Sequence, residues 1–445
     1  MPLSTNSPPP VRSRAQSIRD SIASERFFED DVEVPTGTIG SSSINLANTI
    51  LGSGMLSMAG AMASLGLVFG SLVILFSACT SGMGLYLLSR CARRTTGRDA
   101  SFFAVSKLTY PQAAVFFDAA IAIKCFGVSI SYLIIFGDLV PEVVKALGVE
   151  AQLLLSRGFW ITFAIAALAP LAFQRRLDAL KYTSFTALMG VVYLFIVVAM
   201  FYFNPLRTPL PDGDVVLFRW SKNFFTNLPV FIFAFTCHQN IFSVYNELRD
   251  NSSKQVNGAI ALSIGSSCGV YQWIAVLGYL TFGSKVAPNL LTMYDNSLCH
   301  PARNCLDKVI SSAIRAWKKE PEFEAIANDD NDDQPDTLAS DAATSAPVVH
   351  VMSPAKHISI TFTLLLLSYL VAMSVTSLDL VLSFVGSTGS TSISFILPGV
   401  FYYKMHRNSR WTRMKIISVL LATYGVFVLV FCLGANILRI VNGDL

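Results

Sequence analysis

Long apolar stretches separated by short polar segments make up most of this chain. Ten of them approach or exceed the roughly 20 residues that a helix needs to cross a bilayer. We place them at about Ile39–Met62, Leu67–Ser89, Ala113–Val140, Leu154–Phe173, Phe185–Phe203, Phe224–Val244, Ala259–Phe282, Ile358–Val375, Leu378–Tyr403 and Ile416–Leu438. The pattern predicts an all-α polytopic membrane protein with about 10 visible spans.

The first stretch is interrupted near its middle by Asn45, Asn48 and the sequence Gly52-Ser53-Gly54. Glycine lowers helix propensity by about 1 kcal/mol, and a buried amide needs a hydrogen-bond partner. A helix broken here would expose backbone N–H groups at the start of one half and C=O groups at the end of the other. The first set suits a carboxylate and the second a cation. The alternative is a notch of small residues for helix packing.

A second interrupted stretch lies five spans further on. The sequence FIFAFTCHQNIFSVYNE places Thr236, Cys237, His238, Gln239 and Asn240 within the sixth apolar run. Two polar breaks five spans apart are what a fold of two inverted five-helix repeats predicts. His238 could carry a proton, since imidazole titrates near neutral pH. We favour the other possibility, that it forms hydrogen bonds with neighbouring helices.

Two further groups of polar side chains lie within apolar stretches. A cation inside a membrane costs several kcal/mol unless it is paired, so Lys124 is a candidate functional residue. The structural alternative pairs it with a backbone carbonyl, with Asp118 or with Asp138. The hydroxyls of residues 387–392 can bond back to their own helix or line a path, and we favour the first.

Short loops rich in Lys and Arg normally stay on the cytosolic side. The clearest such loops lie at residues 90–107, 175–181 and 404–415. With the basic N-terminal tail inside, the early loops obey the rule, and the seventh span exits to the far side near Gly283. The loop at 404–415 then falls on the wrong side. One more span between about Tyr294 and Cys299 would restore the rule, and the sequence contains none there.

Four regions follow from these patterns. We expect a disordered cytosolic tail at 1–35, transmembrane helices 1–7 at 36–296, an amphipathic helix with an acidic disordered loop at 297–356, and the last three transmembrane helices at 357–445. The tail lacks the apolar core of a signal peptide. The loop is acidic, contains proline and is poor in aromatic residues, which is typical of a solvated linker.

Composition excludes several classes of function. Only 14% of residues are charged, against about 25% in a soluble domain, and the mean hydropathy is +0.53. Loop lysines and arginines explain the net charge of +4, so we expect no nucleic-acid partner. The cysteines show no disulfide framework and no zinc spacing, so no metal site is expected. Without a P-loop, a G-x-S-x-G or an H-E-x-x-H motif, we expect neither an enzyme nor a cofactor.

Three segments, at residues 41–66, 122–141 and 233–252, resemble the amino acid/auxin permease family. The similarity is to its fungal vacuolar amino-acid transporters and to the sodium-coupled neutral amino-acid transporters of animals. It covers about Thr38–Asn296 and the spans from Ile358 onward. The resemblance implies a LeuT-like inverted-repeat fold with an eleventh helix, and transport of amino acids coupled to protons or sodium.

The resemblance also implies roles for individual residues. An amino acid would bind the backbone at both breaks. The substrate-binding positions so implied are Leu51, Gly52, Ser53, Gly54, Met55, Phe235, Thr236, Cys237 and His238. Asn48 would be a ligand of the coupling ion. A second ion ligand would come from the eighth of 11 helices, which is missing here, and LCHPARN at residues 298–304 resembles its cytosolic end. We interpret this as one helix omitted near Ser297 by gene prediction or splicing.

We therefore predict a secondary active amino-acid transporter that works by alternating access around broken helices 1 and 6. Its partners would be an amino-acid substrate and the lipid bilayer, and its coupling ion H+ or Na+. The vacuolar membrane is the predicted location, with the plasma membrane as the alternative. A sensor or scaffold that binds amino acids without moving them, or an inactive splice isoform, would explain the same residues.

Overall fold

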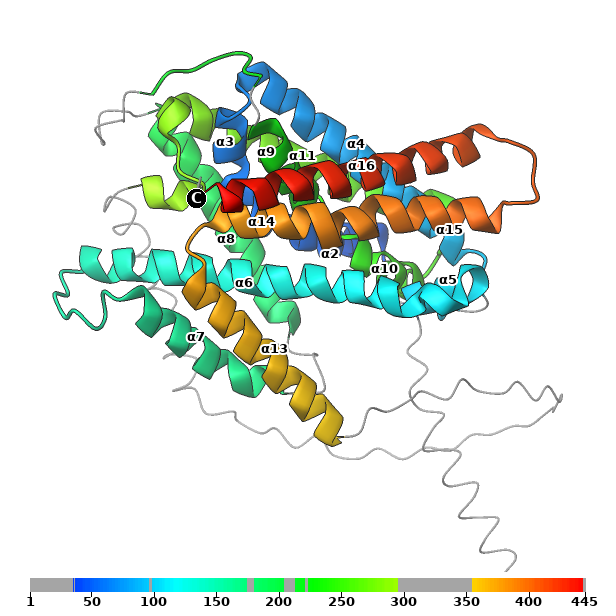
Figure 1. The fold of residues 1–445 in the computed structure, drawn as a ribbon, viewed down its shortest axis with the longest axis horizontal. Helices are drawn as coiled ribbons and strands as arrows, with labels where there is room; N and C mark the ends of the chain where they lie inside the picture. The colour runs from blue at the N-terminus through cyan, green and yellow to red at the C-terminus, as the bar shows by residue number, and fades with distance from the viewer. Residues whose placement is uncertain are drawn as a thin grey trace, which may run out of the picture.

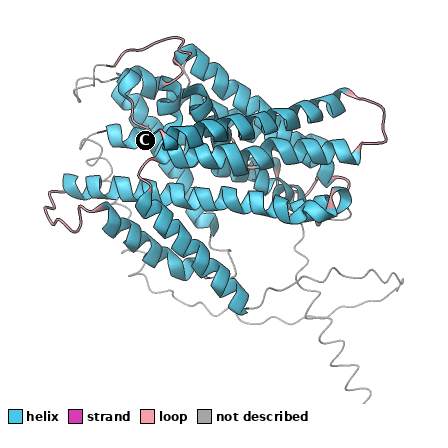
Figure 2. Cartoon of the chain, viewed as in Figure 1, coloured by secondary structure: helices cyan, strands magenta, loops and turns pink. Residues whose placement is uncertain are grey.

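The computed structural model describes residues 35–294 and 354–442, apart from residues 36, 96–97, 174–179, 204–212 and 221–222. Within these residues every regular element longer than a single bridge is a helix (Figure 2). This confirms the predicted all-α class. The predicted tail, amphipathic helix and acidic loop, as well as the expected omission near Ser297, lie outside the described residues.

The helices follow one another as shown in Figure 1. They are α2 Ile39–Ile50, α3 Gly54–Ala63, α4 Leu67–Ala92, α5 Phe102–Thr109, η1 Pro111–Ala113, α6 Ala114–Ala146, α7 Arg157–Ala172, α8 Leu180–Phe203, α9 Asn223–Ala234, η3 His238–Asn240, α10 Ile241–Glu247, α11 Ser253–Phe282, η4 Gly283–Lys285, η5 Leu290–Met293, α13 Pro354–Ser374, α14 Leu378–Val385, η7 Gly386–Ser390, η8 Ser392–Ile396, α15 Leu397–Met405 and α16 Arg413–Val441.

Each of the ten apolar stretches coincides with one of these helices or with several consecutive helical segments. Six helical stretches in the described chain are long and apolar enough to cross a membrane, and the bent pair α2 and α3 makes a seventh. α7, α8 and α13 provide shorter apolar segments. In Figure 1, α7 and α13 lie against α6 at the side of the main group of helices.

The first span is two helices that meet at an angle of 57°. α2 begins after Thr38, whose side chain caps the Ser41 amide while Ser41 Oγ accepts from the Thr38 amide. α2 ends at Ile50 and α3 begins at Gly54. The break predicted at the Gly-Ser-Gly sequence is confirmed.

The sixth span is broken in a similar way. α9 ends at Ala234, and a single 3₁₀ turn, η3, precedes α10. The two breaks are joined by a hydrogen bond of 2.7 Å from Asn240 Nδ2 to Thr49 Oγ1. Because Thr49 lies in the last turn of α2, this bond brings both interruptions to the same level of the molecule.

The span from Leu378 to Met405 is widened rather than broken. Two π-helical segments, η7 and η8, separate α14 from α15. The hydroxyls of Ser387, Thr388, Thr391 and Ser392 each donate to a carbonyl oxygen three to five residues earlier. The predicted bonding to their own helix is confirmed for these four hydroxyls, whereas Ser390 Oγ is buried without a hydrogen-bond partner in the described structure. Segments of π-helix frequently occur at functional sites.

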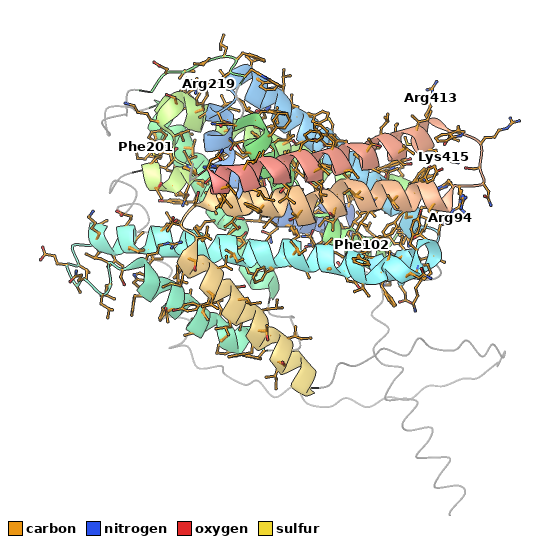
Figure 3. The ribbon with its side chains drawn as sticks, in the orientation of Figure 1. Arg94, Phe102, Phe201, Arg219, Arg413 and Lys415 are labelled. Atoms are coloured by element: carbon orange, nitrogen blue, oxygen red, sulfur yellow. The ribbon has the colours of Figure 1, made fainter. Side chains whose placement is uncertain are left out.

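Charge distinguishes the two ends of the helices. In Figure 3, Arg94, Arg413 and Lys415 lie at one end, which we call the basic end, and Arg219 lies at the other, the opposite end. Arg94 Nη2 is 3.3 Å from His406 Nε2, so the loops that follow α4 and α15 meet there. The positive-inside rule predicts that the basic end is cytosolic.

The sequence predicts that one span is missing after the seventh, and the direction of the helices in the structure agrees with this. α11 leads to η5, where Thr292 shares a hollow with Asp138 and Arg157. α13 leads to Val375, whose carbonyl oxygen accepts from Arg157 Nη2 at 3.0 Å. Both helices thus run toward the Asp138–Arg157 ion pair, which lies at the opposite end. Consecutive spans of the described chain therefore point the same way.

Gly84 provides a test of how closely α4 packs against His238 and Ser394. A Cβ atom at Gly84 would collide with Ser394 O and lie 2.7 Å from His238 Nε2. We expect Gly84→Ala to lower the stability by about 1–3 kcal/mol, because overpacking forces neighbouring backbone to shift. The measurement is the unfolding midpoint of the purified protein in detergent.

The matched control is Gly265 in α11. A Cβ atom there would meet nothing within 4 Å in the described structure. Gly265→Ala should raise the stability by about 0.5–1 kcal/mol, because it removes a glycine from a helix interior. Equal shifts in both variants would contradict the packing of α4 against the sixth span and against the span from Leu378 to Met405.

Candidate functional site

A cavity of about 250 Å³ lies between the two breaks, with walls from α2, α3, α6, α9 and η3. Pockets for drug-sized ligands measure roughly 300–1,000 Å³, so this cavity suits a smaller molecule. Six of the residues singled out from the sequence line it: Asn48, Gly52, Ser53, Gly54, Lys124 and Thr236.

The other five predicted residues do not line this cavity. They are Leu51, Met55, Phe235, Cys237 and His238. Phe235 packs its ring edge-on against Tyr271, with centroids 5.0 Å apart. Cys237 and His238 are completely buried. The unwound segment of the sixth span therefore presents only part of its side chains to the cavity.

Several lining residues were not predicted: Thr49, Ile50, Cys125, Val128, Tyr132, Phe233 and Gln239. A signal for two of them was present in the sequence. Val128 and Tyr132 follow Lys124 at intervals of four residues, which places all three on one face of a helix. Gln239 Oε1 is buried and has no hydrogen-bond partner in the described structure.

Tyr271 of α11 connects the ends of both first half-helices. Its hydroxyl lies within hydrogen-bond distance of Ile50 O and, at 3.1 Å, of Ala234 O. These are the last residues of α2 and α9. A single fully buried hydroxyl thus faces two carbonyl oxygens that a continuous helix would have bonded internally, and its one proton is shared between them. Ile50 O also accepts from the Gly52 amide at 2.7 Å.

The start of α3 leaves the Gly54 amide for an anion. Its N-cap, Ser53, makes no side-chain capping bond, while the next two amides, of Met55 and Leu56, already donate to Gly52 O and Ser53 O. A free N–H group at a helix start attracts negative charge. A Cβ atom at Gly52 would lie 2.7 Å from the Tyr132 hydroxyl, and one at Gly54 2.8 Å from Ala234 Cβ. Glycine at these positions therefore lets α6 and α9 approach the break.

His238 forms part of a buried polar network. Its Nε2 lies 3.1 Å from Ser81 O, which can only accept, so Nε2 carries the proton. Its Nδ1 lies 3.0 Å from Ser394 Oγ, which in turn is 3.2 Å from Thr236 Oγ1. Both ring nitrogens are engaged by the neutral imidazole. The geometry favours the hydrogen-bonding role for His238 over proton transport.

Lys124 has none of the partners that the sequence offered. Asp138 Oδ1 binds Arg157 Nε at 2.8 Å, and Asp118 is exposed on another part of α6. Lys124 makes no hydrogen bond or ion pair with any residue that the structure describes. The structural pairings predicted for Lys124 are therefore wrong.

A second cavity of about 980 Å³ opens at the opposite end. Its walls include Ser57 and Gly60 of α3 and Thr226 and Val230 of α9. Asp379 and Arg439, paired at 2.9 Å, also line it. The same two half-helices, α3 and α9, thus border both cavities.

Comparison with known proteins shows the family. Residues 35–438 match the family described as "Transmembrane amino acid transporter protein". The chain belongs to this family. The resemblance found in the sequence is confirmed, and amino-acid transport is the activity of the family.

Individual relatives of this chain are also named as amino-acid transporters. The fission yeast Schizosaccharomyces pombe has a "Vacuolar amino acid transporter 5" that is 39% identical over 92% of this chain and 97% of its own length. The protein of the same name from Saccharomyces cerevisiae is 35% identical over 88% of this chain and 96% of its own. The human "Sodium-coupled neutral amino acid transporter 7" is 28% identical over 58% and 57% of the two chains. All three are named as transporters, in keeping with the expectation that the chain is not an enzyme.

Tyr271→Phe tests the junction between the breaks. Removing the hydroxyl leaves two buried carbonyl oxygens without this donor, so we expect a loss of about 1–3 kcal/mol in stability and weaker amino-acid binding. Thermal unfolding and equilibrium binding of the purified protein measure the two effects.

Tyr279 of α11 is the matched control. It is equally buried, but its hydroxyl bonds to Val216 N at 2.9 Å, away from the breaks. Tyr279→Phe should lower stability and leave amino-acid affinity unchanged. If both variants bind amino acids equally well, Tyr271 does not organise the site.

Proposed function

We propose that this protein is a secondary active amino-acid transporter of the vacuolar membrane that works by alternating access around its two broken spans. The observation that carries the proposal is the cavity lined by residues of both breaks. The family match supports amino acids as the substrate class, and the names of the yeast relatives support the vacuole. A LeuT-like arrangement of two inverted five-helix repeats accounts for breaks in the first and sixth spans.

The contacts at the two ends support access from one side at a time. At the basic end, Arg98 donates to Asn246 O, Leu248 O and Arg249 O at 2.5–3.0 Å. A backbone bridge joins Gly37 to Leu248 beside it. The large cavity opens at the opposite end. In this conformation the site would be reached from the opposite end, and release to the cytosol would require the contacts of Arg98 and Gly37 to break.

Asn48 is the proposed ligand of the coupling ion, which is H+ or Na+. It lines the small cavity in the last turn of α2, where the carbonyl oxygens at a helix end favour a cation. Uptake with an imposed proton gradient, compared with uptake under an imposed sodium gradient, distinguishes the two ions.

Counterflow in proteoliposomes is the direct test of transport. Vesicles loaded with an unlabelled amino acid should accumulate the labelled amino acid from outside, because a carrier exchanges one for the other. Saturable binding without counterflow would support the sensor or scaffold instead. Absence of both would indicate an inactive isoform.

Gly54→Val tests whether transport uses the first break. The substituent would meet Ala234 Cα and Cβ within 3 Å and separate α3 from α9, so we expect counterflow to fall at least tenfold. Gly190→Val on α8 is the control, since a Cβ there meets nothing described within 4 Å. Normal counterflow by a correctly folded Gly54→Val protein would exclude the proposed site.

A further inference from the structure

Two lysines are buried in the described structure, and they differ in their partners. Lys415 is 3% exposed, and its Nζ donates to Arg407 O at 2.9 Å and to Ser409 O at 3.1 Å. It also lies over the rings of Tyr403 and Trp411. Lys124 is 5% exposed and has none of these contacts. A buried lysine in this protein is thus stabilised by neighbours at one position and left unsatisfied at the other.

The position of Lys124 explains the difference. Lys415 lies at the basic end, whereas Lys124 lines the cavity between the breaks. No Asp or Glu is among the residues that line that cavity in the described chain. An ammonium group buried without a counter-charge costs several kcal/mol, whereas an anion placed beside it in the same surroundings removes most of that cost. The cavity therefore favours a ligand that brings negative charge.

A neutral amino acid does not provide a partner for every polar group at this cavity. Its α-carboxylate would bind the Gly54 amide at the start of α3, where the N-cap Ser53 makes no side-chain capping bond. Its ammonium group could donate to Gln239 Oε1, the buried acceptor that lacks a partner. The carbonyl oxygens of Ile50 and Ala234 already face the Tyr271 hydroxyl. After these assignments the Lys124 ammonium group still has no partner.

We propose that Lys124 binds a carboxylate on the side chain of the substrate, so that the transporter prefers amino acids with an acidic side chain. This rests on the proposed function and specifies its substrate class. Lys124 acts as the specificity-determining residue, while α3 and Gln239 bind the groups common to all amino acids.

The experiment compares L-glutamate with L-glutamine, which have nearly the same size and differ by one charge. Wild-type protein in proteoliposomes should take up glutamate at least tenfold faster than glutamine by kcat/KM. Lys124→Gln should reduce this ratio at least tenfold, mainly by raising KM for glutamate, because only the charged side chain loses a partner. Lys415→Gln is the control and should leave the ratio unchanged.

Stability of the ligand-free protein provides a second readout. Lys124→Gln should leave the unfolding midpoint unchanged or raise it, since it removes an uncompensated buried charge. Lys415→Gln should lower it, since it removes hydrogen bonds and cation–π contacts. A lower midpoint for Lys124→Gln would assign Lys124 a structural role and contradict the proposal.

The remaining outcomes distinguish a failure of the specificity inference from a failure of the proposed function. If wild-type protein prefers glutamine and Lys124→Gln leaves the preference unchanged, the specificity inference is wrong and the transporter assignment stands. Equal loss of both substrates in a stable Lys124→Gln protein would place the lysine at the α-carboxylate and also overturn the inference. If wild-type protein neither binds nor exchanges any amino acid, the proposed function itself fails.

Discussion

Backbone groups freed by a helix break inside a membrane need partners that lipid cannot supply. Here the break in the first span and the break in the sixth lie side by side, and the single proton of the Tyr271 hydroxyl is shared between the carbonyl ends of both. The Asn240–Thr49 hydrogen bond adds a direct link. α11 thereby becomes the element on which both interruptions depend. The unwound segments can persist because a third span satisfies them.

Which groups are satisfied determines what the site can bind. Serine, threonine and histidine side chains near the breaks are largely matched to one another or to carbonyl oxygens, as in the network of Ser81, His238 and Ser394. The Gly54 amide at the start of α3, Gln239 Oε1 and Lys124 Nζ remain for a ligand at the cavity. Since unsatisfied polar groups are expensive in an apolar interior, those that remain at a cavity indicate the chemistry of its ligand.

The elements of the fold could be predicted because their signals are local. Apolar length located the helices, and glycine between polar residues located the break at residues 51–53. The side chains that line the site were harder to predict, because an unwound segment has no helical period. Cys237 and His238 are adjacent to Thr236, yet only Thr236 reaches the cavity. The partner of Asp138 is Arg157, 19 residues away on the next helix, so sequence proximity to Lys124 was misleading.

Close backbone contacts explain how a movement of the helices at the cavity can displace other spans. A Cβ atom at Gly389 in η7 would lie 2.8 Å from the Lys124 backbone nitrogen, and one at Gly386 would collide with Pro229 O of α9. The widened span from Leu378 to Met405 is thus packed directly against α6 and α9, without side chains between. Small residues at helix crossings give such contacts in membranes, where dense packing must replace the hydrophobic effect. A displacement of α9 relative to α3 therefore cannot leave η7 and α6 unchanged, because tightly packed backbones have little free space to absorb it.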